Sequence, residues 1–438
     1  MKKHTRLTAL AAAATAAVMT LAACGGNGES GQADDACTPD NPCTLTFRWW
    51  GGEERQARQR ETIAIFEENN PGIRITALPV SFDGYYDLLG VEMSGRNAPD
   101  IFTLDRSWPL EYGQLGGLAD LTAISSLDLS AFPDTALVAA RIGDAVYGVP
   151  NGGNATGLII NADLFAQAGV ELPDEDTWTW DDFIALAEQI SAATPDGVFG
   201  AEVRPHDFIN AFATQRDGYG LFTPEGDIAV SQETLDDFFT LLLDLQVAGA
   251  SPGASQTSEL MAAGPEETLM GRGLSAMLFA PSNQIGAYAA ASGADLRLIR
   301  IPGESEFSHV GTTVLPSQFF AISADSDYPE AAGLFVSFLI NDLQAGEIMG
   351  VDRGNPVNPY VAAHIAPYLT EIQREQVNFM ERITAFAGPT VAQPTGAGEV
   401  QSITTRAMDE VLFGRQSTSQ AAQAWLEQMQ ASLDTASH

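Results

Sequence analysis

The sequence predicts an α/β fold built on a parallel sheet. Strand-like apolar runs alternate with amphipathic helix-like runs, and turn signals such as the Asn-Pro-Gly at residues 70–72 separate them. The β-α-β-α-β order favours parallel strands covered by helices. At 438 residues the chain is too long for one simple core, and a content of 45% hydrophobic and 18% charged residues is typical of a globular protein.

The expected elements can be placed along the chain from these patterns. The first five are a strand at 44–50, a helix at 53–72, a strand at 73–78, a helix at 84–95 and a strand at 99–105. The later ones are longer helices at 179–193, 206–215 and 233–249 and strands at 275–280 and 296–302. Roughly the last hundred residues should be almost wholly helical, and no internal repeat is visible.

The N-terminus has the parts of a secretory signal. Lys2, Lys3 and Arg6 precede an Ala-rich apolar run that ends in small residues before Cys24. The ending "LAAC" resembles the lipobox of bacterial lipoproteins, which implies that Cys24 carries lipid; a plain signal peptide with a chance Cys is the alternative. We expect residues 1–23 to be a signal peptide and residues 24–43 a lipid-anchored tether. No later segment is apolar over the ~20 residues that a membrane helix needs.

Cys37 and Cys43 are the only other cysteines, and both lie outside the cell once the signal has acted. A disulfide closing this short loop is expected. A metal site would need two further ligands, which are not nearby.

Charge and residue usage exclude several functions. The chain has 21 Lys plus Arg against 57 Asp plus Glu, which disfavours nucleic acid and anionic membrane surfaces as partners and favours a neutral ligand. Every Lys lies in the signal segment, so a phosphate-loop Lys, a Schiff-base Lys and a Ser/Lys nucleophile pair are excluded. The histidines are scattered and no G-x-S-x-G occurs, so we expect no metal, no cofactor and no enzymatic activity.

One dinucleotide-like pattern, "GRGLSA" at residues 271–276, fails on its context. A helix-like run precedes the glycines and a strand-like run follows them, the reverse of the nucleotide-binding order. A helix C-cap that leads into a strand explains it.

At a larger scale the sequence resembles extracellular solute-binding proteins of bacterial carbohydrate ABC transporters, the group that includes maltodextrin-binding proteins. The resemblance lies in the lipobox, "WWGG", "FEENNPGIRI", "NAPDIFTLDRSWPLEYGQLGGLADLT", "VYGVPNGGNATGLIINADLF", "WTWDDFIALAEQI", "SAMLFAPSN" and "FFAISADSDYPEAAGLFVSFLI" in this order. It implies a two-lobe periplasmic-binding-protein-like α/β fold (type II) with an interlobe cleft and hinge crossovers. Lobe 1 would be residues 44–150 plus 318–354, and lobe 2 residues 151–317 plus 355–438.

The same resemblance implies a function and partners. The protein would be a monomer on the outer face of the cell membrane, held there by its lipid alone, and would deliver a mono- or oligosaccharide to permease subunits. A binding protein for a peptide, a polyamine or iron on the same fold is an open alternative, and a secreted glycoside hydrolase is another.

Candidate sugar-binding residues cluster at the expected strand ends and crossovers. Ligands of open α/β sheets bind beyond the carboxyl ends of strands, and an aromatic platform beside carboxylates and amides suits a sugar. Adjacent strand residues point to opposite faces, so we expect Trp50 to line the cleft and Trp49 to enter the core, with burial of both rings between the lobes as the alternative. The full set is Trp49, Trp50, Glu53, Asp83, Tyr85, Tyr86, Asp105, Arg106, Trp108, Asn151, Asn154, Asp207, Asn210, Asn283, Arg353 and Asn355.

Two points limit these assignments. Adjacent Tyr85 and Tyr86 cannot both face inward. The family often has Trp after the strand that "SAMLFA" matches, and Asn283 stands in that region here, so lobe 2 lacks this stacking platform.

Overall fold

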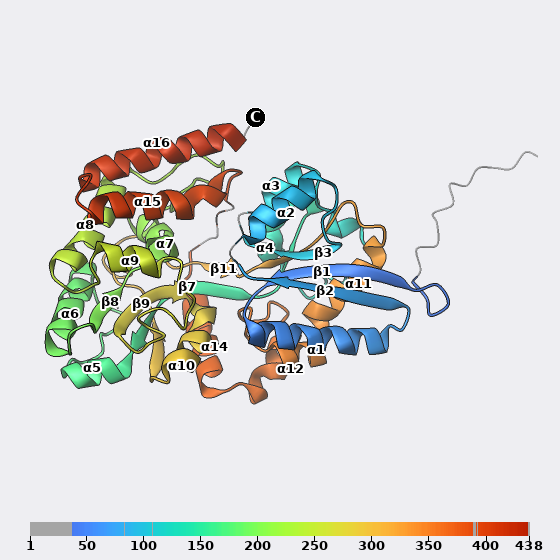
Figure 1. Cartoon of the computed structure of the whole chain (residues 1–438), viewed down its shortest axis with the longest axis horizontal. Coiled ribbons are helices and arrows are strands. Elements are labelled where there is room, and N and C mark those ends of the chain that lie inside the picture. The colour runs from blue at the N-terminus through green and yellow to red at the C-terminus, as the bar shows by residue number, and fades with distance from the viewer. Residues whose placement is uncertain (1–36, 83, 107, 389–390, 392, 437–438) are drawn as a thin grey trace, which may run out of the picture. The chain divides into compact units, whose positions relative to one another are not determined.

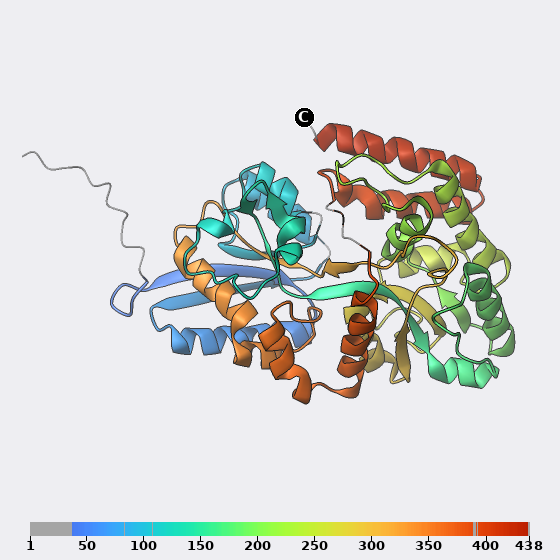
Figure 2. The same ribbon diagram turned by 180° about the vertical axis from the view of Figure 1, so that it is seen from behind.

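The computed structural model describes residues 37–82, 84–106, 108–388, 391 and 393–436. It is a two-lobe α/β fold with one five-stranded sheet in each lobe (Figures 1 and 2). The predicted signal peptide, Cys24 and Asp83 lie outside the described residues. Within the described part, no helix is long and apolar enough to cross a bilayer.

The sheet of lobe 1 has the strand order β2-β1-β3-β12-β6. Its strands are β1 (Cys43–Trp50), β2 (Ile73–Val80), β3 (Ile101–Leu104), β6 (Val149–Pro150) and β12 (Phe319–Ile322). β1 runs parallel to β2 and β3, as predicted, but β12 pairs antiparallel with β3 and with β6. The sheet is therefore mixed, because β12 enters it on the return of the chain from lobe 2.

Helices cover both faces of this sheet. They are α1 (Glu53–Asn69), α2 (Tyr85–Ser94), α3 (Pro109–Gln114), α4 (Asp134–Leu137), α11 (Pro329–Asn341) and α12 (Leu343–Met349), with the short pair β4 (Arg141–Ile142) and β5 (Ala145–Val146) and the 3-10 turns η1 (Leu121–Ala123) and η2 (Val138–Ala140). Phe66 of α1 and Phe335 of α11 pack under Phe47 on one face. On the other face, α2 and α3 pack over Phe102 (Figure 1).

Lobe 2 has the strand order β10-β7-β9-β8, and β11 pairs with the start of β7. Its strands are β7 (Gly153–Asn161), β8 (Phe199–Glu202), β9 (Ser275–Pro281), β10 (Leu296–Ile299) and β11 (Val314–Pro316). β8 and β9 are parallel, whereas β7 is antiparallel to β9 and β10. The ends of β8 and β9 therefore lie at one edge of the sheet.

The helices of lobe 2 form layers: some pack on its sheet, and others pack on those helices. They are α5 (Ala162–Ala168), α6 (Trp180–Ala193), α7 (Pro205–Asp217), α8 (Gln232–Val247), α9 (Ala254–Leu260), α10 (Ile285–Ser292), α13 (Pro359–Ile365), α14 (Glu371–Thr384), α15 (Val400–Leu412) and α16 (Thr418–Ala436), with the 3-10 turns η3 (Ser282–Gln284), η4 (Ala366–Tyr368) and η5 (Ala397–Glu399). α13 instead packs against α12 of lobe 1. The predicted lobe boundary at residue 354 stays a prediction.

Three chain crossovers join the lobes side by side. β6 leads directly into β7, β11 leads into β12, and the segment after Arg353 pairs with the start of β7 (Figure 1). The segments approach so closely that a Cβ on Gly152 would lie 2.2 Å from the carbonyl oxygen of Arg353. Gly354 has φ +101°, which favours glycine. Both glycines are thus required by the geometry of the joint.

At the start of the described chain, Cys37 and Cys43 are joined by a disulfide with a Cα–Cα distance of 5.3 Å. Cys43 is also the first residue of β1, and its backbone N–H donates to Gly72 O at 3.0 Å. The bond therefore ties the segment before the sheet to the first strand.

We predict that this disulfide forms in the secreted protein. The unreduced protein should then show no alkylation at Cys37 or Cys43 by mass spectrometry, and reduction should add two labels. A protein in which both thiols react without reduction would contradict the pairing.

Candidate functional site

An aromatic group lies at the carboxyl ends of β1 and β3 in lobe 1. The ring of Trp50 contacts Tyr85 and Tyr86, with centroid distances of 4.7 and 6.0 Å. Tyr86 stacks on Trp108 at 4.7 Å and 16°, and Trp108 stacks on Tyr112 at 5.2 Å. These rings, which we call the aromatic group, form a continuous series of ring contacts from the end of β1 to α3.

The two adjacent tryptophans take different environments. Trp49 is 0% exposed and packs on Phe47 at 4.9 Å in the core under α1 and α11. Trp50 points to the opposite face, is 8% exposed, and has Phe82, which is 50% exposed, against it at 5.5 Å. The alternation expected of a strand therefore separates the two rings, and Trp50 is the one on the side of the aromatic group.

The adjacent tyrosines also separate. Tyr85 is fully buried and its hydroxyl donates to Thr103 O at 2.7 Å. Tyr86 is half-buried, and its hydroxyl accepts from the backbone N–H of Asp105 at 2.6 Å. Burial raises the pKa of both phenols. Tyr86 thus connects the aromatic group to the chain that follows β3, where Asp105 and Arg106 are half-buried.

Lobe 2 contributes a charged group at the junction of β8 and α7. Arg204 caps α7, Pro205 is its first residue, and His206 and Asp207 follow in the first turn. Asp207 lies 3.7 Å from Arg204 Nε and 3.6 Å from His206 Nε2. Within the described chain, Arg204 Nε and His206 Nδ1 are buried and lack a hydrogen-bond partner. The described protein atoms therefore leave part of the hydrogen-bonding capacity of these two side chains unused.

The charges around His206 act in both directions on its pKa. Burial lowers the pKa of His206, Asp207 opposes that shift, and the positive charges of Arg204 and of Arg106 in lobe 1 add to it. Sequence reasoning found Asp207 but missed Arg204 and His206, although "RPHD" directly after a strand was a usable signal.

The remaining predicted residues fall into different places. Asn154 Nδ2 donates to Asn283 Oδ1 at 3.0 Å at the ends of β7 and β9. Asn210 Oδ1 accepts from Leu221 N at 3.2 Å, and Glu53 is exposed in the first turn of α1. Asn151, Arg353 and Asn355 meet at the crossovers rather than beside the aromatic group. Their assignment to ligand binding stays a prediction.

A segment of lobe 2 reaches the aromatic group. Thr395 Oγ1 donates to Gln114 Oε1 of α3 at 3.1 Å. A Cβ on Gly398 would lie 3.3 Å from the ring of Trp108. The backbone of Gly396 hydrogen-bonds to Glu111, whose pKa burial raises. Trp108 therefore lies between the lobes, within reach of both.

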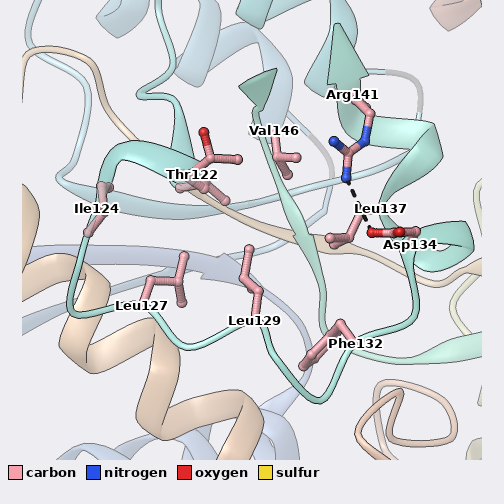
Figure 3. Close-up of a pocket in the computed structure, with 10 residues that line it drawn as sticks. Thr122, Ile124, Leu127, Leu129, Phe132, Asp134, Leu137, Arg141 and Val146 are labelled. Carbon is pink, nitrogen blue, oxygen red and sulfur yellow. Dashed lines mark ion pairs between the residues drawn. The ribbon is translucent and has the colours of Figure 1, made fainter. Parts of the chain in front are cut away.

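A cavity of about 310 Å³ lies elsewhere in lobe 1, between the segments 121–129 and 132–146 (Figure 3). Its lining is Leu121, Thr122, Ile124, Leu127, Leu129, Phe132, Asp134, Leu137, Arg141 and Val146. Asp134 and Arg141 form an ion pair of 3.9 Å at its side. None of the predicted ligand residues lines it, and we do not assign it to the site.

The described residues offer no metal centre. No group of three or more His, Cys, Asp or Glu side chains that could hold a metal ion occurs in the described ranges. The groups that converge are rings, amides, guanidinium groups and carboxylates, which are suited to holding a polar organic molecule.

Comparison with known proteins identifies what this architecture is similar to. Residues 51–345 match the family of bacterial extracellular solute-binding proteins. An uncharacterized lipoprotein of Streptomyces antibioticus is 27% identical over 37% of this chain and 38% of its own length. The lactose-binding protein of Rhizobium radiobacter is 22% identical over 58% of this chain and 60% of its own length. The chain thus spans about two fifths to three fifths of these curated relatives.

A solved structure gives the same fold. A periplasmic oligogalacturonide-binding protein from Yersinia enterocolitica, in complex with saturated digalacturonic acid, superposes with a TM-score of 0.82. The match covers 90% of this chain and 100% of that one at 20% identity, which establishes the fold alone.

We predict that His206 makes stability depend on pH. Its pKa in the folded protein lies below the unfolded value of about 6.5, so protonation favours the unfolded chain. This contribution is complete above pH ~6.5 and is lost as the pH falls. Between about pH 7.5 and 5, the melting temperature should fall more for the wild type than for His206→Gln. The exposed His309 supplies the control, since His309→Gln should behave like the wild type. Equal falls in wild type and His206→Gln would refute the prediction.

Proposed function

Because this chain belongs to the bacterial extracellular solute-binding proteins, we propose that it captures a neutral mono- or oligosaccharide between its lobes for an ABC importer. In this proposal the ligand contacts the aromatic group of lobe 1 and the charged group of lobe 2. The protein then presents the closed form to permease subunits and performs no chemistry on the sugar.

The observation that carries the proposal is the aromatic group at the carboxyl ends of β1 and β3, where the segment at Gly398 of lobe 2 reaches Trp108. A sugar has an apolar C–H face, which stacks on a ring, and a rim of hydroxyls. Trp50, Tyr86 and Trp108 supply rings, and Asp105 and Asp207 supply acceptors. Arg106 supplies several donors in a fixed fork. The lactose-binding relative supports a sugar as the ligand class.

The charges favour a neutral sugar over an acidic one. The chain carries a net charge of −36, which opposes the approach of anions at long range. In the charged group, Asp207 lies against both Arg204 and His206, so the local positive charge is partly balanced. A sugar hydroxyl can donate to the carboxylate and accept from the cationic side chains of this charged group, although the hydroxyl itself is neutral.

A thermal-shift panel tests the ligand class. Neutral mono- and disaccharides should raise the melting temperature of the purified protein, since a ligand at 100 times its dissociation constant adds about 2.7 kcal/mol. The panel also contains a galacturonate disaccharide, a peptide, spermidine and ferric iron. If only one of these four raised the melting temperature, the proposal that the ligand is a neutral sugar would be wrong. Mass spectrometry should recover the bound sugar intact, whereas cleaved product would favour the hydrolase alternative.

The aromatic group supplies the sharper test. Stacking on an aromatic ring is worth ~1–3 kcal/mol, so Trp50→Ala and Trp108→Ala should each weaken sugar binding by roughly ten- to a hundredfold. Trp425→Phe, in the core of lobe 2, is the matched control and should bind normally even if it melts earlier. Small-angle scattering of the wild type should show a smaller radius of gyration with saturating sugar. Normal affinity in both alanine variants together with unchanged scattering would exclude this binding mode.

We propose further that Cys24 anchors the protein by lipid, since the segment ending in "LAAC" precedes a Gly-rich tether. Cys24→Ala should release the protein from membranes into the surrounding medium or periplasm, which fractionation and immunoblotting would detect. Cys37→Ala keeps the same signal segment and should stay in the membrane fraction. Retention of Cys24→Ala in that fraction would disprove the anchor.

A further inference from the structure

The three crossovers between the lobes converge on the side chain of Arg353. Its guanidinium donates to Gln318 Oε1 at 2.6 Å on the second crossover and to Gln59 Oε1 at 3.2 Å on α1. Gln318 also accepts from Asn151 Nδ2 of the first crossover at 3.4 Å. The carbonyl of Arg353 accepts from the hydroxyl of Ser317. Arg353 is only 4% exposed, so a full positive charge is buried at the joint.

This buried charge lacks a hydrogen-bonded carboxylate. The guanidinium's partners in the described structure are neutral amide oxygens. The neighbouring Asp352 instead pairs with Arg55, with Oδ2 2.6 Å from Nε. Burial lowers the pKa of Arg353 to about 9, and the positive charge of Arg55 adds to that shift against the opposing effect of Asp352. The surroundings of Arg353 therefore carry an excess of positive charge at a buried position, which is costly without a counter-ion.

A small cavity of about 30 Å³ adjoins this guanidinium. Gln59, Asn151 and Arg353 supply its polar lining, and Phe320, Leu339 and Met349 its apolar lining. Two buried donors among these side chains, Arg353 Nε and Gln59 Nε2, have no acceptor in the described part of the chain. The orientation of the Gln59 amide is fixed, because turning it would set its NH₂ against the guanidinium. Two residues that line the cavity therefore hold unsatisfied donors, and no carboxylate lines it.

We propose that this cavity is a binding site for a single small anion, chloride. An ion that only accepts hydrogen bonds suits a cavity with two free donors, whereas a water molecule would bring two donors of its own. The volume has room for one ion or one water, so a polyatomic anion is too large. Bound there, chloride neutralises Arg353, whose partners lie on the second crossover and on α1 and are linked through Gln318 to Asn151 of the first crossover. It therefore stabilises the joint itself and is independent of the ligand between the lobes.

Bromide in place of chloride gives the direct test. Crystals of the protein grown or soaked in sodium bromide should show an anomalous peak in the cavity between Gln59 and Arg353, which identifies a halide without reference to stability. Density at this position with no anomalous signal means water, and this outcome, like featureless density, would overturn the proposal.

A solution measurement tests its contribution to stability. The melting temperature should rise with sodium chloride and saturate, while sodium gluconate at equal ionic strength should not reproduce the rise. Gln59→Glu places a carboxylate beside Arg353 as an internal counter-ion, so this variant should lose the chloride-specific shift and melt no lower than the wild type in gluconate. Gln167→Glu makes the same charge change at an exposed position of α5 and should keep the shift.

Two results in solution would contradict the chloride site. An equal rise in both salts, or a chloride shift that persists in Gln59→Glu, would show that chloride does not act at this cavity. If Gln59→Glu does not fold, the bromide peak in the wild type decides alone.

Discussion

The backbone pairing of the three crossovers is the constraint on which the rest of the structure depends. Gly153 and Asn355 exchange two hydrogen bonds of 2.8 Å, and Ser317 N donates to Gly152 O at 2.9 Å. Asn151 N donates to Gln318 O at 3.0 Å, so each crossover is held by another. This joint sets which strand ends of the two sheets face one another, and therefore which side chains can meet a ligand. Movement of the lobes has to be absorbed in these few residues.

Each lobe has its own apolar core. In lobe 2, Phe208 stacks on Phe279 at 4.0 Å among the helices that cover β9. In lobe 1, Phe47 and Phe335 pack at 5.4 Å under the sheet. In the proposed function, a ligand that touches both lobes would shift the balance between an open and a closed form by its different affinity for the two.

Local patterns predicted much of the fold, and long-range pairing accounts for the parts they could not reach. The strand ending at Trp50 and the helix after it follow from alternation and periodicity in the sequence. The antiparallel pairing of β12 does not follow from these patterns, because its partner β3 lies more than two hundred residues earlier. The pattern within one strand does not indicate which strand pairs with it.

The candidate site divides in the same way. The opposite orientations of Trp49 and Trp50 could be predicted, because they depend only on the alternation of side chains along one strand. The approach of the segment at Gly398 to Trp108 needs the positions of both lobes, so no local signal could show it. Arg353 has the residue type and turn context of a ligand group, yet its neighbours at the joint bury it. Residue type alone therefore identifies candidates, and the crossovers decide where they lie.

Tyr86 gives the aromatic group a coupling that individual rings would lack. Its ring contacts Trp50 on one side and stacks on Trp108 on the other, and its hydroxyl accepts from the backbone that carries Asp105. The segment at Gly398 of lobe 2 touches Trp108. A change in the position of Trp108 therefore moves Tyr86 and, through Tyr86, the contacts at the end of β3 and at Trp50. Packed rings shift as a unit rather than deforming separately, because interiors are close-packed. In the proposed binding mode, contact of lobe 2 with Trp108 and placement of the polar groups beside the sugar are thus one event.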